Sequence, residues 1–183
     1  MITDLSEDNL KQWATTIMNG MASIVNTTNV FIPTLFLIGL YDPRTGQFAG
    51  GPKEFTFPIL GKINEGSEGR EHFFTCMRDI CKKSHALSAV LVMPAYCIRA
   101  TDELAAKGPE NIKNPGELAG AQETIVVAFE TLSGNAEYWM AAVTKRGSKR
   151  TASEFVKMNR ELTTLVGLIE PLLKEVVSSS GAN

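Results

Sequence analysis

The sequence predicts an α+β domain in which three main helices cover a mostly antiparallel five-stranded sheet, in the order α-β-β-α-β-β-β-α. Three observations predict this fold. Three segments carry apolar residues at helical spacing, and five short segments have the apolar character of strands. Only one helical segment joins two strands, so most neighbouring strands run antiparallel. At least three strands are apolar on both sides, and both faces of the sheet therefore need cover.

The size and composition of the chain are those of one ordinary globular domain. It has 183 residues, of which 44% are apolar and 21% charged, as in a folded protein with a single core. We expect residues 1–183 to form one domain, with residues 178–183 as a flexible tail. The net charge of −2 argues against a protein that binds nucleic acid or a membrane by bulk positive charge.

The first half of the chain contains a helix, two strands and a second helix. Apolar residues recur at steps of three and four from Leu10 to Val25, after Ser6 as a candidate N-cap. Among the strands, Pro58 indicates a position at a sheet edge or a bulge, because proline donates no ladder hydrogen bond. Ser67 is the expected cap of the second helix. The predicted elements of this half are a helix over 6–25, strands over 34–41 and 54–60, and a helix over 67–83.

The second half contains three strands and the helix with the clearest sequence pattern. Residues 99–122 form a long polar connection with two prolines, and loops of this length are either functional or disordered. A hairpin turn is expected at 133–135. Residues 151–154 (Thr-Ala-Ser-Glu) fit a capping box and predict a helix start. The predicted elements are strands over 87–98, 123–131 and 137–145, and a helix from 151 to 176.

This order of elements is similar to that of profilin-like and roadblock-like domains. The similarity is one of element order alone, so it implies the α+β fold and nothing about function.

The three cysteines give no disulfide framework and no metal motif. Cys76, Cys81 and Cys97 form no Cys-x-x-Cys pair, and their spacing matches neither a zinc nor a haem signature. The longest apolar run, 30–41, is shorter than the roughly 20 residues that a membrane-spanning helix needs. We therefore expect a reduced, cytoplasmic protein without a membrane segment and without a cofactor.

One helix face carries a candidate metal site. Glu68, His72 and Cys76 lie at i, i+4 and i+8 and so share one face of the predicted second helix. Zinc accepts all three ligand types. The alternative is an ordinary amphipathic helix with a Glu–His surface pair and a small apolar cysteine.

A basic stretch is the densest charge feature of the chain. Lys145, Arg146, Lys149 and Arg150 directly precede Thr151, the expected start of the last helix. The free N–H groups and the dipole of a helix start favour an anion, which predicts contact with a phosphate or nucleic acid. The alternative is a solvated loop, since no phosphate-loop pattern and no interleaved aromatic residue is present.

The long connection suggests a ligand pocket. Tyr96, Arg99, Asp102 and Glu123 flank or lie within residues 99–122, and a pocket with such polar groups would indicate a small enzyme or a small-molecule-binding domain.

The leading hypothesis is a non-catalytic interaction module that self-associates or binds a protein partner. It rests on strands that are apolar on both sides and on aromatic residues near strand ends, such as Tyr96 and residues 138–139, because interfaces favour aromatic residues. Nucleic acid is not an expected partner apart from the basic stretch, and we lean against an enzyme because no convergent catalytic motif is found.

Overall fold

The protein folds around one open antiparallel sheet of seven strands. The computed structural model describes residues 4–59, 66–97, 120–158 and 171–173. Six strands follow one another in the order β2-β1-β3-β4-β5-β6. Strand β7 pairs with Trp139 and Met140 of β5, away from the β5 residues that pair with β6. The elements are α1 (Glu7–Thr28), β1 (Thr34–Tyr41), β2 (Phe48–Pro58), α2 (Gly66–Lys83), β3 (Ala86–Cys97), β4 (Gln122–Thr131), β5 (Ala136–Arg146), β6 (Lys149–Ala152) and β7 (Val156–Lys157).

The α+β class and the antiparallel sheet are as predicted, but the counts differ. The sheet has seven strands rather than five, and the described part of the chain holds two helices rather than three. The additional strands are β6 and β7, which occupy the segment where the last helix was expected to begin. Strand β2 also begins six residues earlier than predicted.

The predicted helix start at residues 151–154 is wrong because this segment pairs with β5. Ser153 exchanges hydrogen bonds with Ala142: its backbone N–H donates to the Ala142 carbonyl (2.8 Å), and its hydroxyl accepts the Ala142 N–H (2.9 Å). Phe155 and Met158 pack on opposite faces of the sheet. Three residues apart, they would share one side of a helix, whereas alternation in an extended chain separates them. The pairing of this segment with β5 therefore determines its structure, and the local capping pattern does not.

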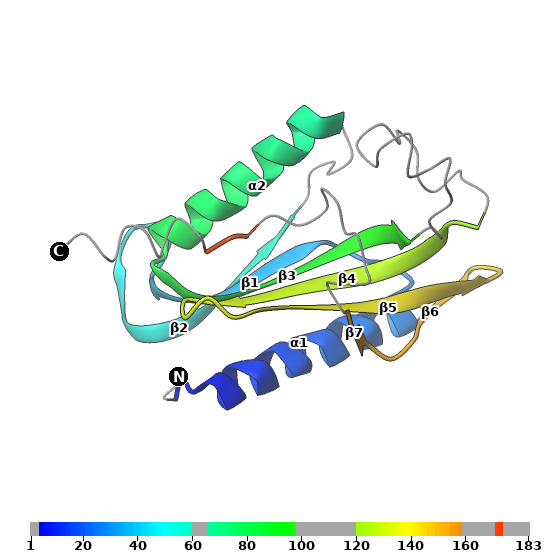
Figure 1. Ribbon diagram of the computed structural model, residues 1–183, viewed down its shortest axis with the longest axis horizontal. Helices are drawn as coiled ribbons and strands as arrows, with labels where there is room; N and C mark the ends of the chain where they lie inside the picture. The colour runs from blue at the N-terminus through cyan, green and yellow to red at the C-terminus, as the bar shows by residue number, and fades with distance from the viewer. Residues whose placement is uncertain (1–3, 60–65, 98–119, 159–170, 174–183) are drawn as a thin grey trace.

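Three layers make up the fold (Figure 1), with α1 on one face of the sheet and α2 on the other. The α1 face of the core contains alternate residues of the central strands, Ile38, Val90, Val92, Ile125, Val127, Phe129 and Val143. The α2 face contains the intervening ones, Leu35, Leu37, Ala89, Leu91, Met93, Val126, Ala128 and Tyr138. Residues 171–173 lie on this second face, beneath α2. Neither helix in the described part of the chain is long and apolar enough to cross a bilayer.

The β2 edge of the sheet is closed by proline and by an arginine. Ile59 N–H donates to the Pro33 carbonyl (2.7 Å). Because bonding alternates along an antiparallel pair, Thr56 and Pro58 direct their backbone groups away from β1. Pro58 has no N–H to offer, and the Thr56 carbonyl accepts from the Arg44 guanidinium (3.3 Å). As predicted from Pro58, β2 is an edge strand, and near its end two of the outward-facing positions are not free to pair with another strand.

The opposite edge, β6, is capped by two asparagines from the end of α1. Within the β5–β6 hairpin, the N–H groups of Arg150 and Ala152 point away from β5. The Asn29 side-chain carbonyl accepts the first and the Asn26 side-chain carbonyl accepts the second, each at 2.8 Å. The final turn of α1 thus provides the hydrogen-bond acceptors that a further strand would otherwise supply.

Replacing one capping asparagine should destabilise the protein. In Asn26→Ala the Ala152 N–H loses its acceptor, and we expect the free energy of unfolding to fall by about 0.5–1.5 kcal/mol. Urea unfolding measures the change. Asn19→Ala, at an exposed position of the same helix, is the matched control and should be neutral or stabilising because alanine is the better helix former. Equal stability of the two variants would contradict the capping role.

Candidate functional site

The basic stretch forms the tip of the β5–β6 hairpin, at the end of the sheet far from the start of α1 (Figure 1). Gly147 and Ser148 make a two-residue turn, and Gly147 has φ of +62°. A glycine with positive φ at the first turn position followed by a residue with negative φ is the arrangement of a type II′ turn, which joins antiparallel strands tightly.

The register of the hairpin brings like charges together. Lys145 lies directly opposite Arg150, and Arg146 directly opposite Lys149. The first pair is on the α1 face, where the Arg150 guanidinium lies 3.4 Å from the Glu123 carboxylate. The second pair is on the other face, because neighbouring residues of a strand point to opposite sides.

The residues predicted to bind an anion lie together in this hairpin, but the helix start that supported the prediction is not there. Thr151 is the third residue of β6 and opposes Thr144, so no helix begins there and no helix dipole reinforces the cations. Anion binding by these side chains remains a prediction that now depends on the hairpin geometry alone.

Two of the three predicted metal ligands lie in contact. The Cys76 Sγ and His72 Nε2 atoms are 3.6 Å apart on α2, while the side chain of Glu68 lies outside the described residues. The chain's other histidine, His85, lies beyond the end of α2 and contacts the Tyr41 ring, with ring centroids 4.7 Å apart. The described ranges contain no group of three or more His, Cys, Asp or Glu side chains placed to hold a metal ion. Metal binding by the trio therefore stays a prediction.

Half of the predicted ligand-pocket set is described. Tyr96 of β3 and Glu123 of β4 are directly opposite in the sheet, so they lie side by side on its α1 face. Glu123 pairs with Arg150 of the basic hairpin, a connection that the sequence did not indicate. Arg99 and Asp102 lie outside the described residues, and the pocket stays a prediction.

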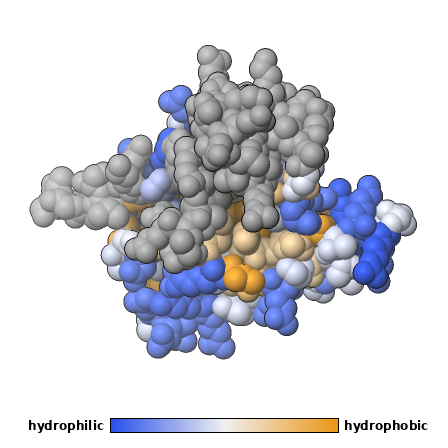
Figure 2. Space-filling model, turned by 45° about the vertical axis from the view of Figure 1, so that its right-hand side comes forward, coloured by the Kyte–Doolittle hydropathy of each residue, from blue (hydrophilic) through white to orange (hydrophobic). Residues whose placement is uncertain are grey.

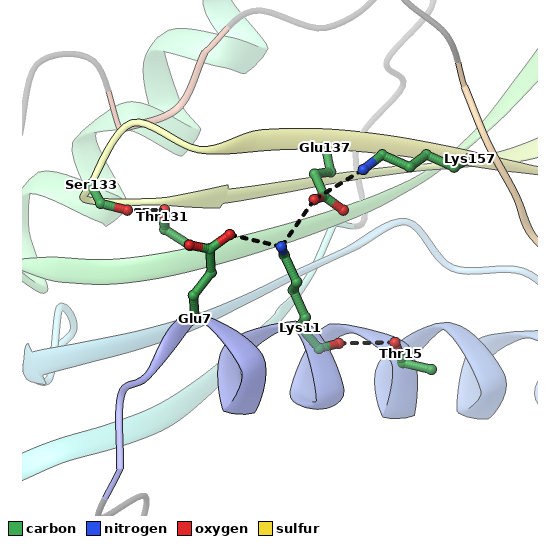
Figure 3. A network of polar contacts seen from close by, with 7 residues as sticks. All are labelled: Glu7, Lys11, Thr15, Thr131, Ser133, Glu137 and Lys157. Atoms are coloured by element: carbon green, nitrogen blue, oxygen red, sulfur yellow. Dashed lines mark hydrogen bonds and ion pairs between the residues drawn. The ribbon is translucent and has the colours of Figure 1, made fainter.

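An alternating chain of charges joins α1 to β5 and β7 (Figure 3). The Lys11 ammonium lies 2.7 Å from Glu7 and 3.4 Å from Glu137, which in turn lies 3.0 Å from Lys157. The hydrogen bond from Lys11 lowers the pKa of Glu7, and the same bond raises the pKa of Lys11. Glu7, Glu137 and Lys157 border an open groove of about 540 Å³ that Tyr138 also lines. Because one or both partners of each pair are well exposed, the pairs contribute little to stability.

A buried carboxylate that the sequence analysis missed holds the segment 171–173. Glu130, at 4% exposure, lies in β4 on the α2 face. One of its oxygens accepts the backbone N–H groups of Leu172 (2.9 Å) and Leu173 (3.1 Å), and both leucines are buried in the core below α2. An acid directly after the apolar run 125–129 was the available signal, because a buried charge needs hydrogen-bond partners.

Glu130 also influences the pKa of a buried thiol, that of Cys81. Burial in the core raises the pKa of the Cys81 thiol to about 12, and the nearby charge of Glu130 acts in the same direction. Thiolate is the reactive form of cysteine, so Cys81 is an inert part of the core.

No family model matches this chain, and no curated protein and no solved structure matches it either. The function of the protein is therefore inferred from the geometry of the molecule.

Removing the charge of Glu130 should destabilise the protein more than the same change on the surface. Hydrogen bonds to a charged acceptor contribute about 1.5–3 kcal/mol, so we expect Glu130→Gln to lower the free energy of unfolding by about 1–3 kcal/mol. Glu123→Gln, on the same strand, is the matched control and should lose less than about 1 kcal/mol because its pair is partly exposed. Urea unfolding compares them, and an equal or smaller loss for Glu130→Gln would refute the anchoring role.

Cys81 should make the protein less stable at alkaline pH. The folded thiol keeps its proton until about pH 12, whereas the thiol of the unfolded chain loses it near 9.0. The unfolded state therefore binds fewer protons between these values, and this contribution to stability declines as the pH rises. Unfolding curves at several pH values should show a shallower decline for Cys81→Ala than for the wild type. An unchanged slope in Cys81→Ala would contradict the assignment.

Proposed function

We propose that this chain is a non-catalytic interaction module that associates with a second copy of itself through exposed apolar side chains. The observation that carries the proposal is a short stretch at the end of α1 and in the linker that follows. Ile24, Val30 and Ile32 are 45%, 52% and 42% exposed. Three large aliphatic side chains within nine residues are more than the scattered apolar groups of an ordinary surface.

Apolar side chains also reach the surface elsewhere. Figure 2 shows an apolar area in the middle of one face, with hydrophilic side chains below it and to its right. Phe48 and Val156 are the most exposed large apolar residues of the described chain. The aromatic residues named from the sequence divide: Tyr96 is exposed, Trp139 is half-buried, and Tyr138 belongs to the core.

The closed edges of the sheet favour one mode of association. Partners that join by strand addition need a row of free N–H and C=O groups at an edge. Here Asn26 and Asn29 accept two outward N–H groups of β6, and at the end of β2 Pro58 offers no N–H and Arg44 binds the Thr56 carbonyl. The proposed self-association therefore proceeds through side chains, in contrast to pairing through the sheet.

The sequence also allows a different class of function. A small enzyme or small-molecule-binding domain would use a pocket near residues 99–122, most of which lie outside the described part of the chain. A cytoplasmic location also remains a prediction.

Self-association should depend on the stretch at the end of α1. We expect the mass measured by light scattering to rise from monomer towards dimer across the micromolar range. Val30→Asp should shift the protein to monomer, because a charge at an apolar interface must be desolvated. Thr16→Asp, which adds the same charge at an exposed polar position of α1, is the matched control and should associate as the wild type does. A wild-type protein that stays monomeric throughout this range would overturn the proposal.

A further inference from the structure

We infer that the β5–β6 hairpin is an arm that binds the phosphate backbone of double-stranded nucleic acid. The inference is independent of the proposed self-association, because it rests on another part of the surface. Its residues are Lys145, Arg146, Lys149 and Arg150, at the tip of the hairpin.

The arm carries cations on both of its faces. Lys145 and Arg150 are directly opposite on one face, and Arg146 and Lys149 on the other. Like charges directly opposite in a sheet destabilise it. Four such residues around a two-residue turn therefore reduce the stability of the hairpin, and an anionic ligand would remove that repulsion.

Within the described residues, a carboxylate neutralises one of these four charges. Arg150 pairs with Glu123 at 3.4 Å. In the ranges that the structure describes, no carboxylate lies within ion-pair distance of Lys145, Arg146 or Lys149. All three side chains are exposed, so they are accessible to a ligand.

The base of the arm is held in place. The Arg150 backbone N–H donates to Asn29 at 2.8 Å, and the Ala152 N–H donates to Asn26 at the same distance. The hairpin is thus fixed to the end of α1, and a ligand meets a preformed arm. A preformed site binds without the entropic cost of ordering a loop.

The two-sided arrangement favours duplex nucleic acid over other polyanions. A two-stranded ribbon fits the major groove of DNA, which is about 12 Å wide and has phosphates along both walls. A flat anionic membrane would engage one face of the ribbon at a time. Single strands are bound largely by stacking on aromatic side chains, and the segment 145–150 contains none.

The charge of the rest of the chain directs how the arm approaches. The whole chain carries 18 basic and 20 acidic residues, so the residues outside these four have a net charge of −6. This net negative charge opposes approach to a polyanion, whereas the cations at the tip of the hairpin attract one. Contacts limited to phosphates predict binding that is independent of base sequence and sensitive to salt.

Fluorescence anisotropy with short duplex DNA tests the inference directly. We expect wild-type protein to bind two unrelated duplex sequences equally at about 50 mM KCl and to lose affinity as salt rises. Arg146→Ala with Lys149→Ala should weaken binding about tenfold or more and reduce the slope of log affinity against log salt by about 2, one for each phosphate contact. Its thermal midpoint should equal or exceed that of the wild type, because a like-charge pair is removed.

Lys82→Ala with Lys83→Ala is the matched control. These exposed lysines end α2, and the double change removes the same charge, so binding should stay within about twofold of the wild type if bulk charge contributes little. Three results would overturn the inference: no duplex binding at low salt, an equal loss in the control variant, or binding to phosphatidylserine vesicles in place of duplex DNA.

Discussion

The fold depends on covering a sheet that is apolar on both faces and carries polar backbone groups at both edges. Helix α1 covers one face, and α2 together with residues 171–173 covers the other. Apolar area removed from water contributes roughly 25 cal/mol per Å², so neither layer can be lost without exposing the centre of the sheet. Each remaining feature of the structure completes this enclosure.

Side-chain oxygens bind backbone N–H groups that the helix backbones leave without a partner. Asn26, Asn29 and Glu130 together accept four backbone N–H groups that have no partner in the strand ladder. A buried N–H without an acceptor costs about 1–3 kcal/mol. The two asparagine contacts also hold the basic hairpin against the end of α1.

Much of the fold could be predicted from local patterns, and what could not depends on contacts between distant residues. Helical spacing identified α1, and alternation with turn residues identified the β4–β5 hairpin. The capping box at 151–154 predicted a helix because local sequence carries no information on the pairing of Ser153 with Ala142. For the candidate site, spacing on a helix correctly placed His72 beside Cys76. The partners of Glu130 lie more than 40 residues away, and no periodicity could indicate them.

Side-chain acceptors complete the hydrogen bonding of the sheet at its β6 edge and below α2. Amide hydrogen exchange measured residue by residue by NMR tests it most directly. We expect four amides to exchange far more slowly than that of Ser148 in the exposed turn, because each is bonded to a side-chain oxygen. They are the amides of Arg150, Ala152, Leu172 and Leu173. Exchange of these four amides as fast as that of Ser148 would contradict it.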